Sequence, residues 1–187
     1  MTITFLDILI LFGLMGGAAM GFFQGLIRQA AATLILYISV VVSALFYRNV
    51  SRFLVRVTGQ LPRTTDVLGF FLIMAVMLVL LLLARHELLS STRADDRRRQ
   101  PIWQNIAGML FGFLNAAILS AVAVIVLRSA VGGEPWAAYA GVQTMLRKGL
   151  SRSWMVYAFR PFTRLLLTLI EPWLFGNQLP PLLRNAL

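Results

Sequence analysis

The sequence predicts an all-α integral membrane protein with four transmembrane helices, glycine-rich helix packing and C-terminal amphipathic interfacial helices. The 187 residues are 59% hydrophobic and only 13% charged, whereas soluble domains contain about 25% charged residues. Four runs of 18 to 28 residues carry no charge: Ile8–Ile27, Gln29–Tyr47, Val67–Ala84 and Gln100–Leu127. A helix needs roughly 20 apolar residues to cross a bilayer core. Because the runs lack the polar alternation of barrel strands, we expect them to cross as helices.

The first two spans are expected to form a hairpin. Residues 8–47 contain one charge, Arg28, and a straight helix of that length would reach about 60 Å, about twice the hydrocarbon core. The chain must therefore reverse, and we place the reversal at Gly25–Ala30, where Arg28 and Gln29 can lie at the membrane interface. Arg28 is then a marker of the turn, with a contact to a lipid head group or a partner as the alternative. The predicted spans are Ile3–Phe23 and Ala30–Phe46.

The middle of the chain supplies two further spans. Arginines at i+4 spacing among apolar residues predict an amphipathic interfacial segment that ends near Gly59 and Pro62: Arg48, Arg52 and Arg56. Residues 67–84 form the third predicted span, and Ile106–Leu127 form the fourth. The sequence Gly-Gly-Glu-Pro at residues 132–135 then breaks the helix.

The remainder of the chain has no uncharged run long enough to cross a bilayer. Apolar residues nevertheless recur with a helical rhythm beside Arg160 and Arg164, at Phe159, Phe162, Leu166, Leu169 and Trp173. This pattern predicts one or two helices lying on the membrane. We therefore divide the chain into a four-span membrane domain, residues 1–130, and an interfacial C-terminal region, residues 131–187.

The side of the membrane that each loop faces is left open by the charges. Lys and Arg residues close to the span ends are almost evenly shared between the two sides, so the positive-inside rule does not decide the orientation. The scarcity of basic residues before the first span favours termini outside the cytoplasm.

Small residues follow one face of two predicted spans at every fourth position. In span one they are Gly13, Gly17, Gly21 and Gly25, and in span four they are Gly108, Gly112, Ala116 and Ser120. Such spacing lets two helix backbones approach closely in lipid. We expect spans one and four to pack together through these small-residue faces, or one of the two faces to pack on another subunit. A pivot for helix sliding is the alternative.

The polar residues do not form a catalytic or metal-binding pattern. No nucleophile elbow, phosphate loop or metal-ligand spacing is present, and the absence of cysteine excludes disulfides. We therefore expect neither an enzyme nor a cofactor. Asn115 lies near the middle of span four and predicts an interhelical hydrogen bond, with a substrate site as the alternative. In a channel, Asn115, Gln24 and the small-residue faces would line the path.

The net charge of +10 comes from basic residues scattered along the chain, 16 of the 17 being Arg. Attraction to anionic lipid head groups explains this charge better than nucleic-acid binding, because each basic residue near the surface contributes about 1 kcal/mol. We therefore expect the lipid bilayer, and not a nucleic acid, to be the partner of these residues.

Three motifs make the chain resemble the colicin V production protein (CvpA) family. They are an acidic residue that opens the first span (Asp7), the junction GFFQGLIRQ (residues 21–29), and AGMLFGFLNA (residues 107–116) in span four. The junction matches the family at Gly21, Gly25, Arg28 and Gln29, and the later motif matches at Gly108 and Gly112. The chain departs from the family pattern at Gln104, Asn105, Ala107 and Ala116. The likeness covers residues 3–130.

The resemblance implies a four-span protein of the bacterial inner membrane linked to colicin V production. In related proteins the same unit precedes a protease domain outside the cytoplasm, which implies outside termini here. The functional residues suggested by the motifs and by polarity are Asp7, Gln24, Arg28, Gln29, Asn105 and Asn115. We expect a non-enzymatic protein that supports toxin production or export, or envelope homeostasis, through a membrane-protein partner or as a homo-oligomer. A small channel or transporter component is the alternative.

Overall fold

The computed structural model describes residues 4–59, 62–90, 102–132 and 140–173, and all regular structure within them is helical. The all-α prediction is therefore confirmed for this part of the chain. The helices are α1 Phe5–Thr58, α2 Pro62–Ser90, α3 Ile102–Val131, α4 Ala140–Arg152, α5 Trp154–Ala158 and α6 Arg160–Ile170, followed by a 3₁₀ turn, η1 Glu171–Trp173. Predicted features at residues 1–3, in the polar loop at 91–101 and at 174–187 lie outside the described residues.

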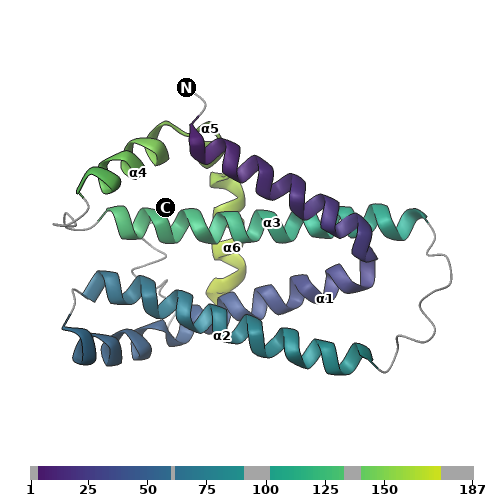
Figure 1. Cartoon of the computed structure of the whole chain (residues 1–187), viewed down its shortest axis with the longest axis horizontal. Helices are drawn as coiled ribbons and strands as arrows, with labels where there is room; N and C mark the ends of the chain where they lie inside the picture. The colour runs from purple at the N-terminus through teal and green to yellow at the C-terminus, as the bar shows by residue number, and fades with distance from the viewer. Residues whose placement is uncertain (1–3, 60–61, 91–101, 133–139, 174–187) are drawn as a thin grey trace.

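Helix α1 is two helices joined at one glycine. Gly25 has φ 76° and ψ 171°, which is not a helical conformation. We call residues 5–24 limb one and residues 26–58 limb two. Figure 1 shows limb one running away from the N-terminus and limb two returning beside α3 and α2. The reversal lies at the first residue of the predicted window, at a backbone conformation that is essentially restricted to glycine.

Limb two continues well past the predicted second span. The basic segment around Arg48, Arg52 and Arg56 is its last part, and all three side chains are exposed. The helix ends where the sequence predicted: Gly59 is left-handed, with φ 64°, and its N–H donates to the carbonyl of Val55 at 2.9 Å. This is a common way to end a helix, since glycine takes the left-handed conformation without a Cβ penalty.

Two described helices are long and apolar enough to cross a membrane, residues 5–57 and Ile102–Val131. The first of these contains the break at Gly25. A shorter apolar helix occupies Thr65–Leu80, within α2.

The main apolar core joins the helices at the start and middle of the chain to α6. Its innermost residues come from limb two, α2, α3 and α6 and include Val40, Tyr47, Phe70, Ile125 and Ile170. Figure 1 shows α6 crossing the long axis of α3 and reaching limb two. There the hydroxyl of Tyr37 donates to the carbonyl of Leu169 at 2.7 Å. The inner face of α6 is thus covered by the other helices.

The predicted apolar positions of the tail divide between buried and exposed sites on α6 and η1. Leu166 is buried in the core and Phe162 packs against it, whereas Leu169 and Trp173 are exposed. Thr163, Leu167 and Ile170 complete the buried side. The buried face is therefore rotated from the one that the apolar spacing alone indicated.

Gly25→Ala is predicted to destabilise the fold by about 1–3 kcal/mol, because alanine is strained at positive φ with extended ψ. The matched control is Gly13→Ala: nothing lies within 4 Å of the position that its Cβ would take. Replacing glycine within a helix there should be neutral or stabilising by up to about 1 kcal/mol. Unfolding in mixed detergent micelles measures both variants. A Gly25→Ala protein as stable as Gly13→Ala would show that the turn does not depend on this glycine.

Candidate functional site

Limb one crosses α3 at a seam of glycines, where the two helix backbones come close together. A Cβ at Gly17 would lie 2.5 Å from the Cβ of Ala116 and 2.7 Å from the carbonyl oxygen of Gly112. A Cβ at Gly21 would overlap the carbonyl oxygen of Gly108 and lie 2.9 Å from the Cα of Gly112. A side chain at Gly17 or Gly21 of limb one would therefore meet mainly backbone atoms of α3, which cannot move aside as a flexible side chain can.

The α3 side of this seam is equally tight. A Cβ at Gly108 would lie 2.5 Å from the carbonyl oxygen of Gly21 and 2.7 Å from the carbonyl carbon of Gly25. A Cβ at Gly112 would overlap the carbonyl oxygen of Gly17. Real Cβ atoms essentially never approach other atoms within 3.0 Å, so larger residues would force the helices apart.

The structure does not bring all the predicted small residues into this seam. Gly13 has nothing within 4 Å of its Cβ position, and the same is true of Gly16. Ser120 is half-buried, one turn beyond Ala116 on α3. The seam therefore comprises Gly17, Gly21, Gly25, Gly108, Gly112 and Ala116. A further close approach, which the sequence pattern did not predict, joins α2 to limb two, where a Cβ at Gly69 would lie 3.0 Å from the carbonyl oxygen of Tyr47.

Three amide side chains meet just inside the reversal. The side-chain nitrogen of Asn115 donates to Gln29 Oε1 at 2.8 Å, and Gln29 Nε2 donates to Gln24 Oε1 at 3.2 Å. Gln29 is buried. We call Gln24, Gln29 and Asn115 the amide cluster. It connects limb one, limb two and α3 by side-chain hydrogen bonds in the same region as the glycine seam.

One atom of the amide cluster has an unused hydrogen-bonding capacity. Asn115 Oδ1 is buried and accepts no hydrogen bond from the described residues. Leaving a buried acceptor unpaired costs about 1–3 kcal/mol. The other two predicted polar residues of this region lie outside the cluster: Arg28 is exposed, and Asn105 is half-buried about 15 Å along α3 from Asn115.

Asp7 lies at the other end of limb one, where it links the start of α1 to the start of α5. It is buried and accepts hydrogen bonds from Ser153 Oγ at 2.5 Å, from the N–H of Met155 at 2.8 Å and from the N–H of Thr4 at 2.7 Å. Ser153 is also the N-cap of α5, since its Oγ accepts from the N–H of Val156 at 3.1 Å. One carboxylate thus caps α1 and holds the start of α5.

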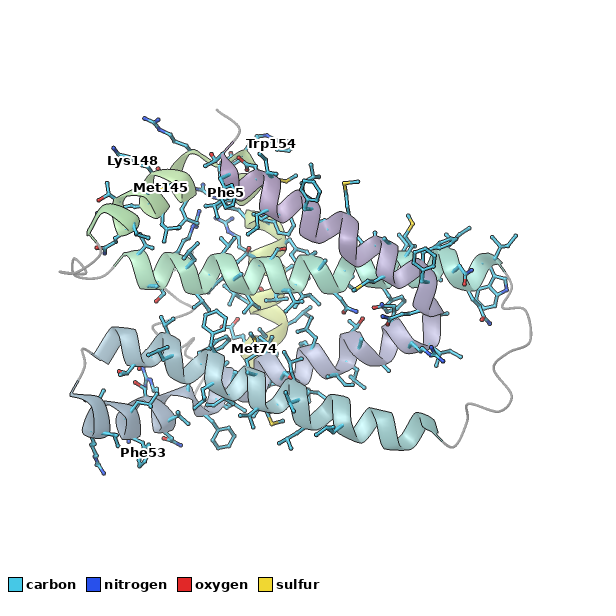
Figure 2. All side chains as sticks on the ribbon, in the orientation of Figure 1. Phe5, Phe53, Met74, Met145, Lys148 and Trp154 are labelled. Carbon is cyan, nitrogen blue, oxygen red and sulfur yellow. The ribbon has the colours of Figure 1, made fainter. Side chains whose placement is uncertain are left out.

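The sequence alone indicates one part of this Asp7–Ser153 contact, namely the helix start at Ser153. A serine before an apolar stretch is a usual helix start, and Ser153 precedes Trp154, Met155 and Val156. The pairing with Asp7 is a tertiary contact between residues 146 positions apart, which no local pattern encodes. Figure 2 shows the neighbourhood, where the start of α1, which carries Phe5, meets α5, which carries Trp154, and α4, which carries Met145.

Two further buried hydroxyls bond their own helix, whereas the buried Ser51 Oγ of limb two donates to Thr65 Oγ1 of α2 at 3.3 Å. Ser39 Oγ donates to the carbonyl of Ile35 at 2.8 Å, and Ser43 Oγ donates to the carbonyl of Ser39 at 2.6 Å. Among the described residues, no three His, Cys, Asp or Glu side chains are grouped to hold a metal ion.

The family model described as colicin V production protein matches residues 6–161. The chain belongs to the colicin V production protein family. The match begins just before Asp7, includes both sides of the glycine seam and the amide cluster, and continues past residue 130 through α4 and α5. The predicted family is confirmed, and the likeness extends farther into the tail than the motifs indicated.

The family description names a process, colicin V production, and not a chemical reaction. Together with the two long apolar helices, membership of the colicin V production family indicates a membrane protein. Neither a search of curated proteins nor a search of solved structures found a match.

Asp7→Ala is predicted to release α5 from α1 and to lower the free energy of unfolding by roughly 2–4 kcal/mol, because Ser153 and the Met155 N–H lose a charged acceptor. Hydrogen exchange should rise at residues 153–158. Asp7→Asn, which keeps one oxygen acceptor, should have a smaller effect. The control is Asp66→Ala, a half-buried acidic residue on α2. Unchanged exchange at residues 153–158 in Asp7→Ala would contradict the role given to this carboxylate.

Proposed function

We propose that this protein is a non-enzymatic, multi-pass protein of the bacterial inner membrane that supports toxin production or export, or envelope homeostasis, by binding a membrane-protein partner. Its four spans would be limb one, limb two, α2 and α3. Limb one contains 20 residues, about 30 Å of helix, which matches a hydrocarbon core of about 30 Å. Limb two is longer, and its exposed arginines, Arg48, Arg52 and Arg56, would lie beyond the core on the side of the N-terminus.

The observation that carries the proposal is how the buried polar side chains are used. Asp7 and Ser153 cap helices, Ser39 and Ser43 bond their own backbone, and Gln29 bonds Asn115. These interactions hold helices in place, and none of them presents a reactive group to a substrate. Because these buried polar side chains serve the packing of the helices, we infer that the protein acts as a scaffold and binds its partner through its outer surface.

The outer face of limb one is the surface on which we expect the partner to bind. Gly13 and Gly16 are exposed there with open space at their Cβ positions, and large apolar residues surround them, including Leu9, Phe12, Met15 and Met20. Small residues at i, i+3 leave a shallow notch that another transmembrane helix can enter.

Crosslinking from this face tests the proposal. The chain contains no cysteine, so Phe12→Cys, at a side chain that is 72% exposed, introduces a single thiol beside the notch. A photoactivatable thiol reagent in native membranes should yield one discrete adduct, which mass spectrometry identifies as another membrane protein or a second copy. The control is Leu80→Cys on α2, which is 54% exposed. Adding Gly16→Leu should abolish the adduct, since it fills the notch.

Two outcomes would contradict the partner proposal. The first is the same smear of products from both cysteine positions, which indicates random collisions in the membrane. The second is a discrete adduct that persists unchanged when Gly16 is replaced by leucine.

One observation favours a second candidate function, a small channel or transporter component. The buried Asn115 Oδ1 has an unused acceptor position next to two further amides, and such a group can bind a polar solute within the membrane. The purified protein in liposomes should then pass a small solute, and Asn115→Leu should reduce the flux more than Leu110→Ala at an exposed position of α3. Absence of flux from the unmodified protein would remove this candidate.

A further inference from the structure

Four arginines converge on one cavity at the end of the molecule that holds the N-terminus of α1. The cavity has a volume of about 760 Å³ and is lined by Arg128 of α3, Arg147 and Arg152 of α4, and Arg160 of α6. Ser151 and Tyr157 add hydroxyl groups to its wall. No acidic residue is among the described residues that line it. Its volume lies within the range of small-ligand sites, about 300–1,000 Å³.

Several contacts hold the walls of this cavity in place. The guanidinium of Arg160 lies over the ring of Tyr157, 4.9 Å from its centroid, an arrangement stabilised by cation–π attraction. Ser153, which also lines the cavity, is bound to the buried Asp7. The Gln143 amide of α4 donates to the carbonyl of Val131 at 3.2 Å and so ties α4 to the end of α3. The four arginines therefore project from helices that are fastened to one another.

The charges of the lining define the ligand class. Arg128 is half-buried, so repulsion from the other guanidinium groups is screened less than at an open surface. An anion bound among these side chains offsets that repulsion. Guanidinium groups bind phosphate oxygens in bidentate pairs, and four of them match a phosphate with several free oxygens better than they match a single carboxylate.

The position of the cavity agrees with the depth of lipid head groups. Arg128 is the first charged residue after the uncharged run that ends at Leu127, and charges prefer the point where a helix leaves the hydrocarbon. Trp154 and Tyr157 are exposed close by, as is typical of the aromatic belt at a membrane interface. Lys148 lies on the adjoining α4 (Figure 2), and the Cβ position of the next residue, Gly149, is 3.3 Å from Leu6 Cδ1 at the start of limb one.

We propose that this cavity binds the phosphate group of an anionic ligand, either a phospholipid head group or a free phosphate. This site is separate from the partner-binding face of limb one, and it stands whether or not that proposal holds. Arg128, which is half-buried, forms its inner wall, and Arg128 and Arg160 also line a second hollow of about 20 Å³ together with Arg164. Arg147 and Arg152 are exposed on α4 and form its outer rim.

The test is a titration of the full-length protein, purified in a neutral detergent, with thermal unfolding as the readout. Dioleoyl phosphatidylglycerol should raise the unfolding midpoint in a saturable way, since a ligand that binds only the folded state stabilises it. Zwitterionic phosphatidylcholine is the lipid control, and millimolar inorganic phosphate forms a separate arm. A response to the anionic lipid alone assigns the site to a head group. Saturable stabilisation or competition by phosphate assigns it to a free phosphate, and either result supports the proposal.

Charge-matched variants decide whether the response comes from this cavity. Arg147→Gln combined with Arg152→Gln removes two exposed rim charges and should raise the half-saturating concentration about tenfold, the loss expected for charge-assisted hydrogen bonds. Arg128→Gln should also raise the half-saturating concentration, because it removes a charge from the inner wall. If Arg128→Gln does not fold, the comparison between the rim variant and the control tests the proposal. The control, Arg48→Gln with Arg56→Gln, removes two exposed charges from limb two. Equal losses in control and rim variants, or no saturable response in the unmodified protein, would overturn the proposal.

Discussion

The backbone contact between limb one and α3 is the constraint on which the rest of the structure depends. At this crossing, the side chains that would separate the helices are absent, and carbonyl groups of one helix lie where the Cβ atoms of the other would be. In lipid, helices gain little from the hydrophobic effect, because the solvent is as apolar as their side chains, so close packing must supply the attraction. The crossing therefore requires residues without a Cβ atom at four positions: Gly17, Gly21, Gly108 and Gly112.

The other features follow from this contact. Gly25 turns the chain so that limb two returns on the other side of α3, and the amide cluster then connects all three helices near the turn. At the far end of limb one, Asp7 binds the start of α5, which sets the direction in which α6 leaves to cross the core. The tail is thus anchored through limb one, and the arginines of α3, α4 and α6 face one cavity as a result.

Much of this architecture could be predicted from the sequence, because its causes are local. The uncharged runs predicted helices, a 40-residue apolar stretch required a reversal, and the spacing of glycines indicated which faces could approach closely. The sequence could not predict which of the regularly spaced glycines contact α3. Gly13 and Gly17 follow the same i+4 spacing, yet only Gly17 contacts α3, because the contact depends on the point at which the two helices cross. The Asp7–Ser153 contact, the rotated inner face of α6 and the arginine cavity each need residues from distant segments to meet.

The central claim is tested most directly by comparing two Gly→Ala substitutions on the free energy of unfolding in mixed micelles. Gly112→Ala places a methyl group against the carbonyl oxygen of Gly17, whereas Gly16→Ala places one in open space. Overpacking of this kind costs about 1–3 kcal/mol, while the helix propensity of alanine gives back up to about 1 kcal/mol. The account predicts that Gly112→Ala is clearly less stable than Gly16→Ala. Equal stability of the two variants would show that the helices do not depend on backbone contact at this crossing.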